Sequence, residues 1–185
     1  TEAGRSLALT LGRRLPQSAL RGYASPAHRC IETASLLIEG ANTQHQRQLG
    51  EPTARPVEAL GVFYALDQIR MWKGLRQAEG LSGYVAQWVY GGVDSAIMMA
   101  PTLAARFILD VLLAKLDSPG PQQQSPSIDI CVTHDMTILM MRHVLGLEPV
   151  EQGPVNYLDG LLLYREGERG MLASSLGGRV VLDPS

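Results

Sequence analysis

Apolar residues near the start of the chain recur at the spacing of a helix and then give way to a short apolar run. In residues 3–15 apolar side chains stand four apart, at Ala3, Leu7, Leu11 and Leu15. This period places them on one face, so we predict an amphipathic helix with Thr1 as its N-cap. Residues 20–24 are short and apolar, which predicts a buried strand.

The dipeptide Ser25-Pro26 follows this strand and predicts the start of a second helix. Serine is a preferred N-cap residue, and proline is favoured at the first helical position. Apolar residues then continue at helical spacing from Ala27 to about Glu39. We expect this helix to end at Gly40, because glycine readily takes the left-handed conformation that ends helices.

The middle of the chain changes from polar to aromatic. Residues 41–56 are polar and predict a surface connection, whereas six of the ten aromatic residues lie in residues 61–100. We expect short helices in this aromatic segment, separated by the glycines Gly74, Gly80, Gly83, Gly91 and Gly92. A longer helix is predicted from Pro101 to Leu116, followed by a solvated loop over residues 117–127.

The last third of the chain predicts one more strand and helix, and then a hairpin. Residues 128–133 are strand-like, and a helix is expected from about Met136 to Leu145, closed by Gly146. The apolar runs 157–165 and 171–176, separated by the polar turn 166–170, predict a terminal hairpin. Strands that alternate with helices favour a mainly parallel sheet covered on both faces, in an α/β fold.

Polar residues stand where two of these predicted strands end. In α/β sheets ligands bind beyond the carboxyl ends of the strands, at helix N-termini. Here those ends carry residues 25–29 and residues 133–135.

Arg29 and the pair His134-Asp135 are the candidate residues for chemistry. Arg29 lies in the first turn of its predicted helix, where a phosphate would meet a guanidinium and the helix dipole together. The alternative is a solvated arginine or an ion pair with Glu32. For the pair, either both titratable groups serve acid-base or phosphate chemistry, or Asp135 caps a helix beside a structural histidine.

The remaining histidines give weaker signals. His28 precedes Arg29 and is expected to face another direction, His45 stands in the polar connection, and His143 stands within a helix. Four scattered histidines predict no metal cluster, and no cofactor motif is present: a Walker loop and the Gly-x-Gly-x-x-Gly fingerprint are both missing.

Composition is that of an ordinary globular domain. The 185 residues carry a formal net charge of −2, with 45% apolar and 18% charged residues. Scattered basic residues argue against nucleic-acid binding, and no apolar run is long enough to cross a bilayer. Cys30 and Cys131 stand in apolar patterns, so we expect reduced, buried thiols and a cytoplasmic location. We expect one domain over residues 1–185.

Three motifs in order give this chain a resemblance to a known family. They are Thr1-Glu2-Ala3-Gly4-Arg5, Ser25-Pro26-Ala27-His28-Arg29 followed by Thr33-Ala34, and Thr133-His134-Asp135. The chain resembles the histidine phosphatase superfamily, which is phosphoglycerate mutase-like. That resemblance implies a three-layer α/β/α sandwich with a mainly parallel central sheet, and a small phosphorylated substrate without cofactor or metal.

The resemblance also implies roles for individual residues. Arg29 and His134 would bind the phosphoryl group, and Asp135 would protonate the leaving alcohol, as in the acid-phosphatase branch of the family. Glu58 is the alternative proton donor, as in the mutase-like branch. Residues 61–100 would form a helical, aromatic-rich insertion that covers the pocket, although packing of small helices explains the aromatic residues equally well.

One motif of the family is missing from the sequence. The nucleophilic histidine of the family lies in an Arg-His-Gly motif, which the resemblance places upstream of Thr1, and this motif does not occur in the chain. We therefore expect a phosphomonoester hydrolase whose nucleophile lies upstream. A mutase-like phosphotransferase and a non-catalytic phosphate-binding module are the alternatives.

Overall fold

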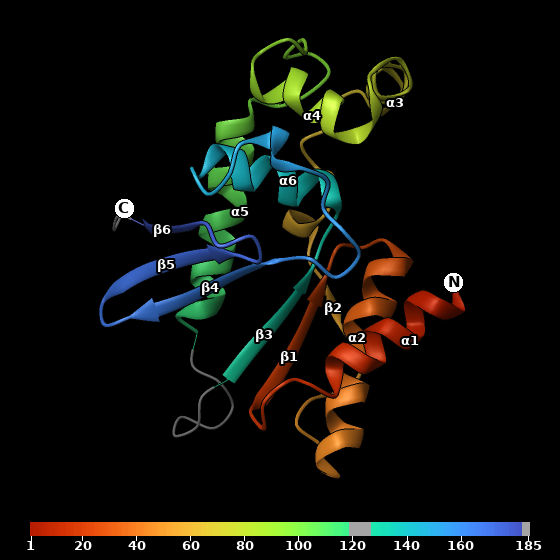
Figure 1. The fold of residues 1–185 in the computed structure, drawn as a ribbon, viewed down its shortest axis with the longest axis vertical. Helices are drawn as coiled ribbons and strands as arrows, with labels where there is room; N and C mark the ends of the chain where they lie inside the picture. Colours follow the sequence, from red (N-terminus) through yellow and green to blue (C-terminus); the bar gives the residue numbers. More distant parts are fainter. Residues whose placement is uncertain (119–126, 183–185) are drawn as a thin grey trace. The chain divides into compact units, whose positions relative to one another are not determined.

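The structure, a computed structural model, describes residues 1–118 and 127–182. In those residues the chain is a mixed α/β protein with six α-helices and two three-stranded sheets (Figure 1). It forms two compact units, one of Thr1–Gly61 and Lys115–His134, the other of Val62–Ala114 and Asp135–Ser185. The predicted α/β class is confirmed.

The first unit is built around a small parallel sheet in which β1 pairs with both neighbours. Its elements are α1 (Glu2–Gly12), β1 (Ala19–Ala24), α2 (His28–His45), β2 (Arg55–Pro56), the 3-10 helix η1 (Glu58–Leu60) and β3 (Ser127–Val132). Strand β1 lies in the middle, in the order β2-β1-β3. The predicted loop over residues 117–127 lies mostly outside the described residues.

Helix α2 covers one face of this sheet. Its buried residues Cys30, Ala34 and Ile38 pack against the apolar side chains of β1, and Gly22 of β1 lies so close that a Cβ there would be 2.8 Å from Ile38 Cδ1. On the opposite face the Lys115 ammonium lies 3.7 Å from the centre of the Tyr23 ring. The strand predicted at residues 20–24 is therefore confirmed as β1.

Helix α1 begins as the sequence predicts. The Thr1 hydroxyl oxygen accepts a hydrogen bond from the Gly4 backbone N–H at 3.2 Å. Two glycines then allow α1 and α2 to approach closely, because a Cβ at Gly12 or at Gly40 would collide with a carbonyl oxygen of the other helix.

Both predicted ends of the second helix are wrong. The helix begins at His28, and its cap residue is Ala27, whose methyl side chain has no oxygen to accept a cap hydrogen bond. It also continues past Gly40 to His45 and ends at Gln46, which takes the left-handed conformation with φ 49°. Gly40 therefore serves helix packing and does not end the helix.

The predicted surface connection after this helix is shorter than expected. Residues up to His45 are helical, and the Asn42 side chain holds the loop that follows, accepting from the Leu49 backbone N–H at 2.7 Å. The chain then forms the two-residue strand β2, which the sequence did not predict, since two residues show no periodicity.

The second unit buries most of the large apolar side chains. Its elements are α3 (Gln68–Gln77), α4 (Gly80–Val89), the main part of α5 (Pro101–Leu116), α6 (Asp135–Val144), the 3-10 helix η2 (Val150–Gln152), β4 (Leu161–Glu166), β5 (Arg169–Ser174) and β6 (Arg179–Leu182). Tyr64 and Trp88 lie at the centre of its core, with ring centroids 4.9 Å apart.

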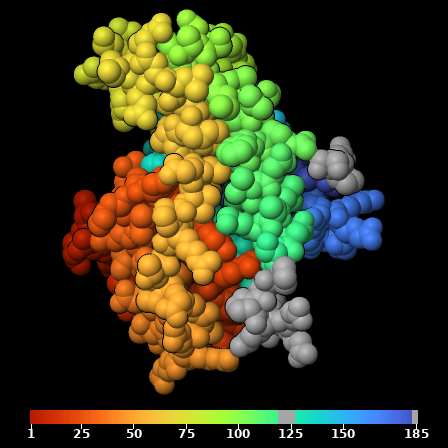
Figure 2. All heavy atoms as spheres, turned by 180° about the vertical axis from the view of Figure 1, so that it is seen from behind, coloured from red at the N-terminus to blue at the C-terminus, as the bar shows by residue number. Residues whose placement is uncertain are grey.

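The glycines of the aromatic segment play two different roles. Gly80 and Gly91 have positive φ angles of 74° and 81° at helix ends, as expected of breaks. Gly74 and Gly83, predicted as breaks, lie inside α3 and α4. Gly74 admits the Tyr84 ring, because a Cβ there would be 2.7 Å from Tyr84 Cε2. Figure 2 shows the yellow and yellow-green atoms of these two helices packed side by side.

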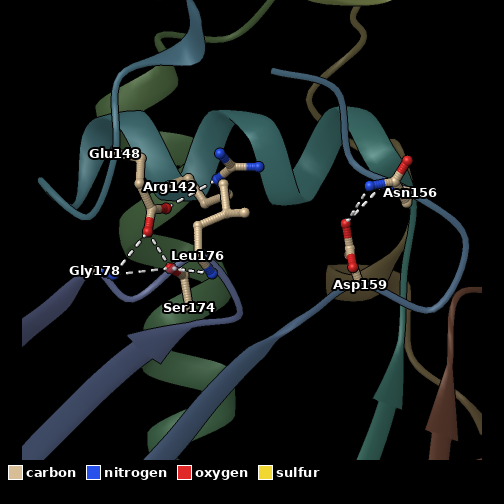
Figure 3. A network of polar contacts seen from close by, with 7 residues as sticks. All are labelled: Arg142, Glu148, Asn156, Asp159, Ser174, Leu176 and Gly178. Carbon is tan, nitrogen blue, oxygen red and sulfur yellow. Dashed lines mark hydrogen bonds and ion pairs between the residues drawn. The ribbon is translucent and has the colours of Figure 1, made fainter. Parts of the chain in front are cut away.

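The chain ends in the predicted hairpin, extended by one strand. Strands β4 and β5 pair antiparallel, and β6, which the sequence did not predict, adds to β5. A buried ion pair joins this sheet to α6: Arg142 Nε donates to Glu148 Oε2 at 3.0 Å, and Glu148 Oε1 accepts from the Gly178 N–H at 3.0 Å and from the Ser174 hydroxyl (Figure 3). Among the described residues, no helix combines the length and the apolar character needed to cross a membrane.

Candidate phosphate site

The carboxyl ends of β1 and β3 lie next to each other. Ala24 pairs with Val132, and the Ser25 backbone N–H continues the ladder by donating to the Val132 carbonyl at 2.8 Å. Because the two strands are parallel and in this register, the residues that follow them meet at one edge of the sheet. The sequence predicted this edge as the site.

Three side chains meet there (Figure 1 locates β1, β3 and the start of α2). His134 Nε2 lies 2.8 Å from the Ser25 hydroxyl oxygen, and His134 Nδ1 lies 3.0 Å from Arg29 Nη2. Ser25 is buried, His134 is partly buried and Arg29 is exposed. The structure thus brings together Arg29 and His134, two of the predicted site residues, and adds Ser25.

Arg29 is the second residue of α2 and points back toward the sheet edge, as helical side chains do. The predicted alternative, an ion pair with Glu32, is not what the structure has. Glu32 pairs with Arg5 of α1 at 2.7 Å. The first backbone N–H groups of a helix have no partner within the helix, so a guanidinium here adds to an edge that already favours anions.

Contacts from η1 and α2 hold the strand end that carries His134. The Thr133 hydroxyl donates to the Leu60 carbonyl at 2.7 Å, and the Cys30 thiol donates to the Thr133 carbonyl at 3.6 Å. Gly61 allows the turn after η1 to pass close by, since a Cβ there would be 3.1 Å from the Glu58 carbonyl and 3.7 Å from Ser25 Oγ. These contacts fix the backbone of Thr133, and so they fix the point from which the His134 side chain extends.

Two contacts of His134, with Ser25 and with Arg29, favour one form of its ring. A guanidinium has only donors, so Arg29 requires that Nδ1 accept with its lone pair. With Nδ1 accepting, the proton of the neutral ring lies on Nε2, where it can be donated to the Ser25 oxygen 2.8 Å away. The Ser25 oxygen also accepts from the Ala27 backbone N–H at 3.3 Å. Two lone pairs of one hydroxyl serve the two donors.

The candidate proton donors lie in different parts of the chain. Asp135 is exposed and is the first residue of α6, and its Oδ1 accepts from the Met136 backbone N–H at 2.9 Å. Asp135 belongs to the second unit, whereas His134 belongs to the first. Glu58 is exposed in η1 of the first unit. Both carboxylates are accessible to solvent.

Burial affects the pKa of two other groups. The pKa of the Tyr64 phenol is raised because it is buried, against the effect of its 2.8 Å hydrogen bond to Thr137, while the charge of Asp135 adds to the rise. Burial, reinforced by the charge of Asp129, raises the pKa of the Cys131 thiol to about 12. A thiol with so high a pKa is neutral at physiological pH and is a poor nucleophile.

The other three histidines have different surroundings from His134. His28 is exposed beside Arg29 in the sequence, and His143 stacks edge-on against Tyr90 with ring centroids 5.0 Å apart. His45, predicted in a loop, lies in the last turn of α2 and contacts the Leu15 carbonyl at 2.9 Å. Within the described ranges no group of three or more histidine, cysteine, aspartate or glutamate residues could hold a metal. Cys30 and Cys131 are both thiols.

Ser25 has a different role from the N-cap that its sequence position predicts. Its position before proline suggested an N-cap, but the cap residue is Ala27, and the Ser25 hydroxyl contacts His134 as well as the Ala27 N–H. The available signal was the strand-end rule, which places Ser25 and His134 at one edge. That rule does not say which of the polar side chains at an edge touch.

Comparison with known proteins adds no relative: no family model matches the chain, and no curated protein and no solved structure matches it significantly.

Proposed function

We propose that this protein is a phosphomonoester hydrolase that acts through a phosphohistidine intermediate. The observation that supports this most is the Arg29–His134 contact of 3.0 Å at the carboxyl ends of two parallel strands. A guanidinium and an imidazole at such an edge, beside a helix N-terminus, can surround the oxygens of a phosphoryl group.

The proposed reaction has two steps. A nucleophilic histidine attacks phosphorus and the bond to the leaving oxygen breaks, while Asp135 gives a proton to that oxygen. Water then attacks the phosphohistidine, Asp135 takes back a proton from the water, and inorganic phosphate leaves. Arg29 and His134 stabilise the charge on the equatorial oxygens of the phosphoryl group as it is transferred. The role of Asp135 rests on the sequence resemblance alone.

The proposal needs a nucleophile that the described site does not supply. No Arg-His-Gly motif occurs in the printed sequence, and His134 already holds the phosphate-binding role. In the first unit, β3 is an edge strand of the described sheet. An edge strand has backbone groups that a further strand can pair with. We propose that residues upstream of Thr1 supply that strand and its histidine, and complete a three-layer α/β/α sandwich.

A turnover measurement on the full-length protein tests this function. Arg29→Ala should lower kcat/KM on an aryl phosphate by about 100- to 1,000-fold, as expected when one donor to the developing charge is removed. Arg47→Ala is the matched control, because Arg47 is an exposed arginine of the loop after α2. An Arg29→Ala rate equal to that of the control would contradict the proposal.

A non-catalytic phosphate-binding module is the second candidate, favoured by the missing motif. Titration calorimetry with inorganic phosphate separates the two. Binding that depends on Arg29, without turnover on any phosphomonoester, would favour the module. Transfer of the phosphoryl group to a second hydroxyl of a phosphorylated acceptor, and not to water, would favour a mutase. The substrate, the pocket-covering role of residues 61–100 and a cytoplasmic location remain proposals from the sequence.

A further inference from the structure

The Ser25 hydroxyl has features that an incidental contact would not need. Ser25 is only 2% exposed, yet its side chain lies 2.8 Å from His134 Nε2 at the edge of the sheet. A buried hydroxyl without a partner is costly, so its hydrogen bonds are set by the fold. Its own backbone is fixed by the bond to the Val132 carbonyl, and Gly61 packs over its side chain.

We propose that Ser25 is a positioning residue, which accepts the proton on His134 Nε2 and so keeps Nδ1 directed to Arg29 and to an incoming phosphoryl group. This inference rests on the proposed function for the identity of the ligand, but not for the state of the ring. Since Ser25 occupies Nε2, only Nδ1 can meet a ligand at this edge.

This arrangement suits a histidine that must bind an anion. Without ligand, Nδ1 accepts from Arg29 Nη2 at 3.0 Å. When the guanidinium turns to a phosphoryl oxygen, Nδ1 can take up a proton and donate to the same group. Nε2–H donates to Ser25 in both states, because a hydroxyl oxygen can accept in either case. The imidazole ring of His134 therefore need not flip when its charge changes.

The alternative assignment fails on donor and acceptor counting. If Ser25 donated to a bare Nε2, the proton of the neutral ring would lie on Nδ1, and it would face the Arg29 donor. Two donors would then lie 3.0 Å apart. The geometry thus assigns the accepting role to Ser25.

Nitrogen NMR of the protein labelled with ¹⁵N-histidine reads this state directly. In phosphate-free buffer, the full-length protein should show a His134 ring that is protonated at Nε2 and unprotonated at Nδ1. The signal is assigned by its loss in His134→Gln. A His134 ring with its proton on Nδ1 would overturn the inference without any variant, and with no bearing on whether the protein hydrolyses phosphomonoesters.

Variants then test whether Ser25 is the cause. Ser25→Ala should convert the single tautomer of His134 into a mixture and weaken binding of inorganic phosphate by about 10-fold, whereas Ser25→Thr, which keeps the hydroxyl, should restore both. Ser35→Ala is the matched control, since its hydroxyl bonds the Ile31 carbonyl of α2 at 2.9 Å, away from His134. An unchanged tautomer in a folded Ser25→Ala protein would overturn the inference. If phosphate fails to bind while the tautomer depends on Ser25, the proposed function fails and the positioning role stands.

Discussion

Two exposed carboxylates, Asp135 and Glu58, are the candidate proton donors of the proposed reaction. They can be told apart by substrate chemistry, because only a poor leaving group needs a proton in the transition state. Asp135→Asn should lower kcat on an alkyl phosphate by about 100-fold or more, and on a nitroaryl phosphate by less than about 10-fold. Parallel assays of Glu58→Gln, which should affect both substrates equally little, provide the matched control. If Glu58→Gln has the selective effect instead, the donor is Glu58.

Cys131 gives a pH prediction that involves no catalysis. Its pKa is raised by burial from 9.0 to about 12, so the folded state retains a thiol proton that the unfolded chain loses. The resulting stability is complete below about pH 9 and is lost as the pH rises toward 12. Each pH unit in that window costs about 1.4 kcal/mol.

Urea unfolding at pH 8 and pH 10 measures this effect. Wild type should lose about 1.4 kcal/mol more than Cys131→Ala over this interval. Val132→Ala, on the same strand but without a titratable group, should keep the wild-type loss. Equal losses in wild type and Cys131→Ala would show that the thiol titrates as it does in the unfolded chain.

At the scale of elements, the contact between α1 and α2 depends on two glycines. A Cβ at Gly40 would meet the Leu9 carbonyl oxygen and lie 3.1 Å from the Arg13 nitrogen, both of them backbone atoms that cannot rotate away. Alanine gains about 1 kcal/mol of helix propensity over glycine, but overpacking against a fixed neighbour costs about 1–3 kcal/mol and more against backbone.

Gly40→Ala should therefore lower the free energy of unfolding by about 2 kcal/mol, in urea unfolding followed by circular dichroism. Gly83→Ala in α4 is the control, because a Cβ there would meet only the Cβ of exposed Glu79, at 3.3 Å. Its effect should lie within about 1 kcal/mol of wild type. A stabilised Gly40→Ala protein would mean that the two helices can separate at low cost.

The same elements illustrate what a sequence can predict. Helices α1 and α5 and strands β1 and β3 follow from local periodicity and capping residues, and their positions were predicted to within a few residues. The end of α2 was missed because Gly40 is a glycine for the sake of close packing against α1. No local sequence pattern encodes such a contact. The edge that holds Arg29 and His134 was predicted by the strand-end rule. The hydroxyl that completes it, on Ser25, depends on the register of β1 against β3.

At the scale of the whole molecule, the division into two units does not follow the order of the chain. The chain passes between the units after Gly61, Ala114 and His134, so the successive residues His134 and Asp135 belong to different units. Such a division arises from contacts between segments that are distant in the sequence, and local sequence patterns cannot predict these contacts. The expectation of one domain over residues 1–185 stays a prediction.

The second unit contains both tryptophans, whose fluorescence reports on its unfolding, and a buried ion pair. Trp88, only 2% exposed, donates to the Met99 carbonyl at 2.8 Å. The Arg142 and Glu148 side chains are 4% and 7% exposed, and Arg142 Nη2 has no hydrogen-bond partner in the described structure. Because Glu148 also holds Ser174 and Gly178, removal of Arg142 would leave a buried carboxylate without its counter-charge (Figure 3).

Arg142→Met should lower the free energy of unfolding of this unit by about 3–5 kcal/mol, measured by tryptophan fluorescence in urea. The double variant Arg142→Met/Glu148→Gln should recover part of that loss, because an amide still accepts from Ser174 and Gly178 but carries no charge to desolvate. Arg106→Met is the control, since Arg106 pairs with Asp110 on an exposed face of α5, where an ion pair contributes about 0–1 kcal/mol. If Arg142→Met cost no more than the control, the carboxylate would have to be reached by water in the folded protein.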